Sequence, residues 1–270
     1  MTHSMKLSRR QVLLSAAGAT FLGFGPRPSQ AEPRRGGRLR AGLSHGATTD
    51  VIDPAKCDNG FTQTIVYALF NGLTEAGPKG ELLPGLAESW EAAPTASTWH
   101  FKLREGVTFH NGQNLTPQDV IASINRHRGP DSTSGAKGIL TSIQDIKADG
   151  PRGVIFTLAE PNADFPFILS DFHLGILPVK NGAVDATSPI GTGSYELVEF
   201  NPGVRALLKR SPTHWRTDRG YFDEVELLTI IDATARTNSL LAGEVDVINS
   251  CDPKTAEYLK ANTQIAVDQA

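Results

Sequence analysis

The sequence predicts a mixed α/β fold, because segments with the two-residue alternation of strands interleave irregularly with segments that have helical periodicity. Residues 38–43 alternate and predict a first strand. Residues 61–70 place Ile65, Val66 and Leu69 on one helical face, and Gly72 follows as a stop signal. The chain contains no internal repeat, and the irregular order of strands and helices predicts α/β or α+β lobes.

The middle of the chain predicts a β-hairpin followed by a capped helix. Residues 98–103 alternate, and glycine-containing turns flank a second short strand at residues 107–110. Thr116 then supplies a side-chain cap, with proline in the first turn, for a helix that ends near His127. Further strands are expected at residues 154–158, 195–200, 206–209 and 225–231, and a further helix from Asp232 to Gly243.

Composition excludes one class of partner. The 270 residues are 39% hydrophobic and 20% charged, which is ordinary for globular proteins and fits one or two domains. The net charge is −3, but the first 31 residues hold four basic side chains and no acid, so the remainder has 22 basic and 29 acidic side chains, a net charge of −7. A nucleic-acid partner is therefore not expected.

The N-terminus predicts an exported precursor. Basic residues, including Arg9 and Arg10, precede the apolar run 12–24, and small residues then favour cleavage between Ala31 and Glu32. Residues 1–31 are thus expected to be a signal peptide. The paired arginines favour the twin-arginine type, and the alternative is a plain basic region that directs general export.

Two cysteines, Cys57 and Cys251, follow the predicted cleavage point. A disulfide between them is chemically possible in an oxidising compartment. The alternative is two separate thiols, because few residue pairs satisfy the narrow distance window of a disulfide. The sequence leaves both possibilities open.

Motifs for catalysis and cofactors are weak. Ser44 lies in a G-x-S-x-G pattern after a predicted strand, but a loop rather than a helix is expected next, so a secreted serine hydrolase using Ser44 is only a minor alternative. The G-T-G segment at residues 191–193 lacks the third glycine of a dinucleotide fingerprint and precedes a predicted strand. The histidines show no metal-ligand spacing. We therefore predict no catalytic residue, no metal and no cofactor.

Several ordered blocks resemble one family, the extracellular solute-binding proteins of family 5, which include peptide, nickel and opine binders. The most recognisable are L-L-P-G-L-A-E-S-W at 82–90 and the region 98–119. Supporting blocks occur at residues 36–43, 52–54, 189–195, 214–215 and 232–247. The resemblance covers residues 36–260 and implies a periplasmic binding protein-like fold of class II, the large two-lobe type.

The resemblance also implies a domain organisation. Residues 32–35 are expected to be a linker, and residues 36–270 the N-terminal part of a family 5 domain. This part would contain most of the first lobe and its inserted subdomain. The second lobe would be absent, so we expect a truncated form of the two-lobe fold.

The implied function is the substrate-binding component of an ABC importer. Such a protein captures a small solute, for example an oligopeptide, opine or metal chelate, in the periplasm and delivers it to an inner-membrane permease. The full-length form is expected to be a monomer. A non-binding remnant of a split gene is the alternative. The implied ligand-binding residues are Asn59, Gly60, Phe61, Asp171, Phe172 and His173.

Overall fold

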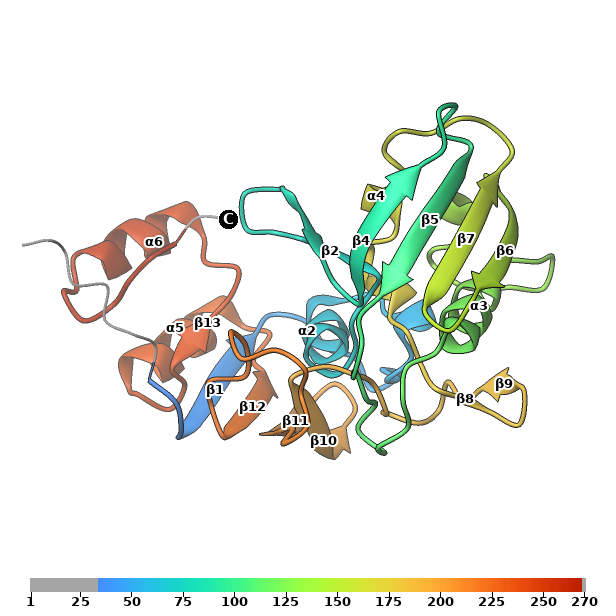
Figure 1. Ribbon diagram of the computed structural model, residues 1–270. Helices are drawn as coiled ribbons and strands as arrows, with labels where there is room; N and C mark the ends of the chain where they lie inside the picture. The colour runs from blue at the N-terminus through green and yellow to red at the C-terminus, as the bar shows by residue number, and fades with distance from the viewer. Residues whose placement is uncertain (1–33, 269–270) are drawn as a thin grey trace, which may run out of the picture. The chain divides into compact units, whose positions relative to one another are not determined.

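The computed structural model describes residues 34–268 (Figure 1). The predicted signal peptide, its cleavage point between Ala31 and Glu32, and the first two residues of the predicted linker lie outside the described residues. Within residues 34–268, no helix is both long enough and apolar enough to cross a membrane.

A five-stranded mixed sheet lies below helix α2 in Figure 1. The first strand, β1 (Arg38–Leu43), runs parallel to β12 (Glu224–Thr229) on one side and to β13 (Val247–Ile248) on the other. Strand β11 (Arg205–Arg210) pairs antiparallel with β12, and β10 (Tyr195–Asn201) pairs antiparallel with β11. The strands predicted at residues 38–43, 195–200, 206–209 and 225–231 are confirmed.

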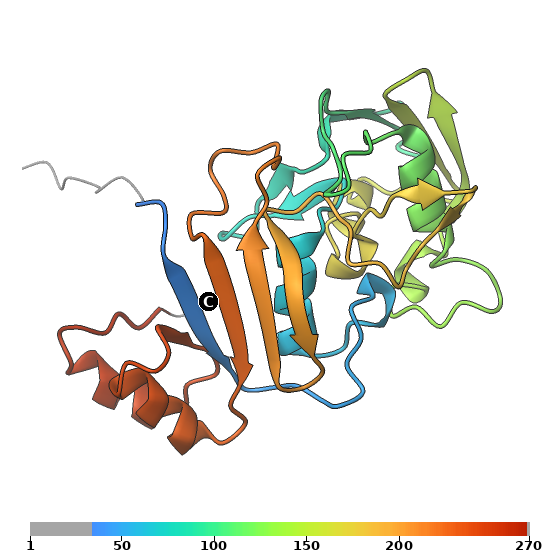
Figure 2. The same cartoon turned by 90° about the horizontal axis from the view of Figure 1, so that it is seen from below.

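Helix α2 (Gly60–Leu69) covers one face of this sheet (Figure 2). Asn59 starts the helix, because its Oδ1 accepts hydrogen bonds from the backbone N–H groups of Phe61 and Thr62, at 3.0 and 3.2 Å. Its apolar face, which includes the fully buried Ile65, packs against the strands in a core of its own. The predicted helix is confirmed and begins one residue early.

A four-stranded antiparallel sheet has the order β4-β5-β7-β6. Its strands are β4 (Ala87–Ala92), β5 (Thr98–Leu103), β7 (Gly153–Leu158) and β6 (Ile143–Asp149). Helix α3 (Pro117–Asn125) packs against β6 and β7. A second core fills this part of the chain, and its centre is aromatic: the ring centroids of Phe101 and Phe156 lie 5.4 Å apart.

The predicted strand at residues 107–110 is wrong. Only an isolated bridge between Thr108 and Asn114 forms there, and β5 pairs with β4 and β7 instead. The segment folds back on itself, because Phe109 N–H donates to the Gln113 carbonyl at 2.8 Å. Alternation correctly marks Phe109 as buried, but burial alone does not make a strand.

The start of α3 depends on Asp119 more than on the predicted Thr116 cap. The Thr116 hydroxyl donates to Asp119 Oδ2 at 2.6 Å, and the Thr116 N–H donates to the same oxygen at 2.8 Å. Asp119 Oδ1 accepts from the N–H of Val179 at 2.7 Å. Asp119 is fully buried, so this one carboxylate ties the helix start to the strand β8 (Val179–Lys180).

The G-T-G segment crosses the last turn of α2, which explains its glycines. A Cβ at Gly191 would lie 2.0 Å from the carbonyl oxygen of Leu69, and a Cβ at Gly193 would lie 2.2 Å from that of Ala68. Gly193 N–H donates to the Leu69 carbonyl at 2.9 Å. These glycines permit close backbone contact and do not form a phosphate-binding loop.

Helix α5 (Ala233–Leu241) begins after Asp232, as predicted, because Asp232 Oδ1 accepts from Ala235 N–H at 2.7 Å. Helix α6 (Pro253–Lys260) was not predicted. The remaining elements are η1 (Pro54–Lys56), β2 (Thr74–Ala76), β3 (Leu82–Pro84), η2 (Gly138–Leu140), α4 (Phe165–Ile168), η3 (Phe172–Leu174) and β9 (Ala183–Val184). Both cysteines are free thiols, Cys57 buried and Cys251 half-buried, and burial raises the pKa of Cys57.

Candidate functional site

Polar groups gather where the parallel strands β1 and β13 end. Asn249 Oδ1 accepts from the backbone N–H of Ser44 at 2.8 Å, and the Ser44 hydroxyl donates to Ser250 Oγ at 3.1 Å. In open α/β sheets, ligands bind outside the carboxyl ends of the strands. Asn249 and Ser250 were missed from the sequence, because the strand before them, β13, has only two residues and was not predicted.

The first predicted segment, Asn59 to Phe61, adjoins this edge. Asn59 Nδ2 donates to Asp50 Oδ1 at 2.7 Å, so the Asn59 side chain both bonds to the preceding loop and caps α2. A Cβ at Gly60 would lie 3.8 Å from both Asn249 Nδ2 and His45 Nδ1. Phe61 is fully buried, and its ring stacks on Phe200 inside the core. Gly60 therefore lies at the surface of this edge, whereas Phe61 packs in the core beneath it.

The second predicted segment, Asp171 to His173, contacts Cys57, two residues before the first segment. Asp171 Oδ1 accepts from both the backbone N–H and the Nδ1 of His173, at 3.0 and 2.6 Å. His173 Nε2 lies 3.0 Å from the carbonyl oxygen of Cys57. Both ring nitrogens therefore face acceptor oxygens, and this histidine links segments that lie 116 residues apart in the sequence.

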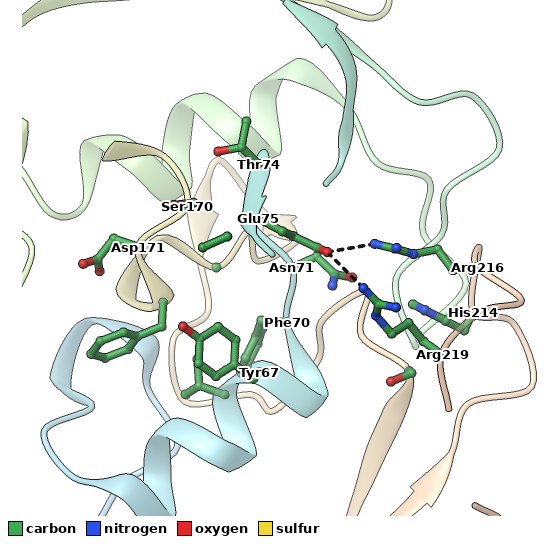
Figure 3. Close-up of a pocket in the computed structure, with 16 residues that line it drawn as sticks. Tyr67, Phe70, Asn71, Thr74, Glu75, Ser170, Asp171, His214, Arg216 and Arg219 are labelled. Atoms are coloured by element: carbon green, nitrogen blue, oxygen red, sulfur yellow. Dashed lines mark hydrogen bonds and ion pairs between the residues drawn. The ribbon is translucent and has the colours of Figure 1, made fainter. Parts of the chain in front are cut away.

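A cavity of about 280 Å³ opens beside the second segment (Figure 3). Figure 3 shows Asp171 at one end, Arg216 and Arg219 at the other, and Tyr67 between them. Asp171 and Phe172 line it, while the other four predicted residues do not. The full lining is Val66, Tyr67, Phe70, Asn71, Gly72, Thr74, Glu75, Ala76, Ser170, Asp171, Phe172, Gly175, Ser194, His214, Arg216 and Arg219.

The two ends of the cavity differ in charge. Arg216 Nη1 donates to Glu75 at 2.8 Å, and its other nitrogens contact both oxygens of Asp218 at 2.9 Å. The hydrogen bonds from Arg216 lower the pKa of Asp218 to about 2, so this carboxylate is ionised at neutral pH. Burial lowers the pKa of His214, which favours the uncharged ring at neutral pH.

Trp215 packs next to Arg216 at the arginine end of the cavity. Two guanidinium groups lie over its ring, with the central carbon of Arg104 at 4.8 Å and that of Arg216 at 5.2 Å from the ring centroid. Trp215 Nε1 donates to Asn71 Oδ1 at 3.2 Å, which also accepts from the Thr192 hydroxyl at 3.0 Å. The wall is therefore held by hydrogen bonds across three separate segments.

The geometry at Ser44 does not form a nucleophile elbow. Ser44 Oγ lies 2.7 Å from His45 Nδ1, so a serine–histidine pair exists. An elbow, however, needs a sharp turn from a strand directly into a helix. The residues after Ser44 form a loop until η1 at Pro54. Among the described residues, no group of three or more His, Cys, Asp or Glu side chains could hold a metal ion.

Known proteins are similar to this chain over most of its length. The family described as "Bacterial extracellular solute-binding proteins, family 5 Middle" matches residues 81–270. The periplasmic oligopeptide-binding protein OppA of Escherichia coli (strain K12) is 28% identical over 235 residues, which are 78% of this chain and 43% of OppA. The oligopeptide-binding protein AppA of Bacillus subtilis (strain 168) is 27% identical over 272 residues, covering 96% of this chain and 49% of AppA.

Solved structures agree with the observed fold. AgaA from A. tumefaciens R10, in complex with agropinic acid, matches with a TM-score of 0.78 and 28% identity, covering 84% of this chain and 46% of AgaA. DppA from Helicobacter pylori, in complex with the peptide STSA, matches with a TM-score of 0.76 and 25% identity, covering 87% of this chain and 51% of DppA. The fold is thus that of a periplasmic binding protein, and the chain spans about half the length of these proteins.

Proposed function

Because the chain belongs to the bacterial extracellular solute-binding proteins of family 5, we propose that it captures a small solute for an ABC importer. The solute class is a peptide or a similar small molecule such as an opine or a metal chelate. Capture takes place in the periplasm, after export directed by residues 1–31, and an inner-membrane permease receives the loaded protein. No bond of the solute is broken.

The observation that carries this proposal is that the two predicted segments lie near each other in the fold. His173 contacts the carbonyl oxygen of Cys57, two residues before Asn59, and Gly60 adjoins the strand ends where α/β proteins bind ligands. The adjoining cavity has an aromatic middle and a carboxylate at one end. Such a mixed lining suits a solute with an apolar part and a few polar groups.

Individual roles follow from the contacts. Among residues 34–268, Asp171 Oδ2 accepts no hydrogen bond, since the contacts of this carboxylate go through Oδ1, so it is free to accept from an ammonium or amide group. Tyr67 and Phe172, whose ring centroids lie 6.2 Å apart, offer faces to an apolar side chain. Gly60 lets the solute approach the backbone, because it carries no Cβ.

The test is binding of a pool of short peptides to the purified chain, followed by native mass spectrometry and calorimetry. We expect saturable retention of one unmodified peptide, weakened about tenfold by Asp171→Asn through loss of one charge-assisted hydrogen bond. Asp149→Asn is the matched control, because it removes the same charge from the end of β6 in the other sheet.

Two outcomes would contradict the proposal. If the chain retains no solute at all, the non-binding alternative holds. If peptides or esters are instead cleaved, and Ser44→Ala abolishes the cleavage, the chain is a hydrolase.

A further inference from the structure

A second cavity, of about 290 Å³, adjoins the first and has an unusual lining. Four arginines line it, and no carboxylate does among the residues that the structure describes. The two cavities share four residues, including Arg216 and Arg219. Three of the arginines come from one short stretch, residues 210–219, and the fourth, Arg35, precedes β1.

This cavity lies at the opposite edge of the sheet from the strand ends described above. Arg35 precedes β1, whereas Ser44 follows it, and the six residues of β1 span about 20 Å at the rise of an extended strand. Arg210 ends β11, which runs antiparallel to β12, so it too lies at the amino end of β1. The second cavity is therefore separate from the edge that holds Gly60 and Asn249.

Three of the guanidinium groups keep unused donors. Arg35 Nη2 donates to the Thr217 carbonyl, and Arg35 forms no ion pair with any carboxylate in residues 34–268. Arg210 contacts Asp223 through Nη2 alone, at 2.6 Å. Arg219 Nη1 donates to Asp218 Oδ2 at 3.2 Å and to the Asp218 carbonyl at 3.3 Å, and its Nη2 lies 3.9 Å from Glu75 Oε2. Each guanidinium has five N–H donors, so several donors remain at each of these side chains.

The charges around the cavity do not cancel. Arg216 pairs with both Glu75 and Asp218, which balance its charge, so it contributes little to the binding of an anion. The four guanidinium groups face three carboxylates, those of Glu75, Asp218 and Asp223, which leaves an excess of one positive charge. The neutral ring of His214 adds none.

We propose that the arginine-lined cavity binds a small oxyanion, a carboxylate or phosphate group, next to the first cavity, with which it shares Arg216 and Arg219. Planar guanidinium groups bind such oxyanions with paired, charge-assisted hydrogen bonds. Gly220, which also lines the cavity, is suited to its position, because a Cβ there would lie 3.1 Å from Ser194 Cβ and its φ of +63° disfavours side chains. Arg35, Arg210 and Arg219 supply the donors.

The test is calorimetric titration of the purified chain with sulfate, inorganic phosphate and succinate, at constant ionic strength set with sodium chloride. We expect saturable one-to-one binding that weakens about tenfold in Arg35→Gln and in Arg210→Gln, through the loss of charge-assisted hydrogen bonds. Lys209→Gln is the matched control, because Lys209 neighbours Arg210 on β11, carries the same charge and does not line the cavity. It should change the affinity less than twofold, about the effect expected of a screened surface charge.

The outcomes separate the possibilities. Tighter binding of succinate than of phosphate assigns the site to carboxylates, and the reverse assigns it to phosphates. The proposal is overturned if none of the three anions saturates, or if Lys209→Gln weakens binding as much as Arg210→Gln does. No peptide is present in these titrations, so their failure leaves the proposed capture of a solute standing.

Discussion

His127 should make the protein less stable as the pH falls below neutrality. Its side chain is fully buried at the end of α3, and its Nδ1 lies 2.6 Å from Ser134 Oγ. Burial, and then the nearby charge of Arg126, lower the pKa of His127 from its usual 6.5 to about 4, against the opposing effect of Asp53. The folded protein therefore resists protonation of this ring.

The magnitude follows from linkage. The unfolded chain takes up a proton on this residue below pH 6.5, whereas the folded chain does so only below about pH 4. The free energy of unfolding is therefore unaffected above pH 6.5, falls between pH 6.5 and 4, and is constant below. The loss is about 2 kcal/mol at pH 5 and about 3 kcal/mol at its limit, at 1.36 kcal/mol per pH unit.

Urea denaturation of the wild-type chain and of His127→Gln, at pH 7.5 and at pH 5, measures this difference. The variant should be less stable at pH 7.5 because it disturbs the packing, but its free energy of unfolding should fall by about 2 kcal/mol less between the two pH values. His100→Gln, which removes an exposed ring on β5, is the control and should keep the wild-type pH dependence. Equal pH dependence in the wild type and His127→Gln would refute the reasoning.

Two further predictions concern other parts of the chain. Gly191→Ala should destabilise the fold by at least about 2 kcal/mol, because its Cβ would meet the Leu69 carbonyl oxygen at 2.0 Å, and an unchanged urea midpoint would contradict this close approach. Replacing both Arg9 and Arg10 by lysine should leave uncleaved precursor in the cytoplasm, because the twin-arginine receptor reads guanidinium groups rather than charge; normal processing in cell fractions would instead indicate general export.

Local patterns in the sequence predicted elements whose stabilising contacts are also local. The helix of residues 61–70 was recognisable because its apolar face repeats every three to four residues, whereas its cap, Asn59, was not predicted as one. The 107–110 segment shows the limit of this reasoning. Its apolar residues alternate because Val107 and Phe109 are buried, yet their backbone groups bond within a tight turn rather than to a strand.

The candidate site was only partly predictable, for a physical reason. The resemblance pointed to Asp171 and His173, but the bond from His173 to the Cys57 carbonyl depends on how η3 packs beside α2. Three arginines of the second cavity lie within residues 210–219, but no site was predicted there. Their convergence with Arg35 depends on the pairing of β1 with β12, which composition does not reveal.

Arg236 shows how a distant residue shapes the candidate site. It is buried, and its guanidinium donates to four carbonyl oxygens, those of Ile230, Ile231, Asn249 and Ser250. These bonds hold the turn after β13 against the helix α5, and Asn249 in turn accepts from the backbone N–H of Ser44. The Ser44 N–H and the carbonyls of Asn249 and Ser250 are thus already paired within the protein, so under the proposed function the second carboxylate oxygen of Asp171 is a clearer acceptor for a solute than these groups.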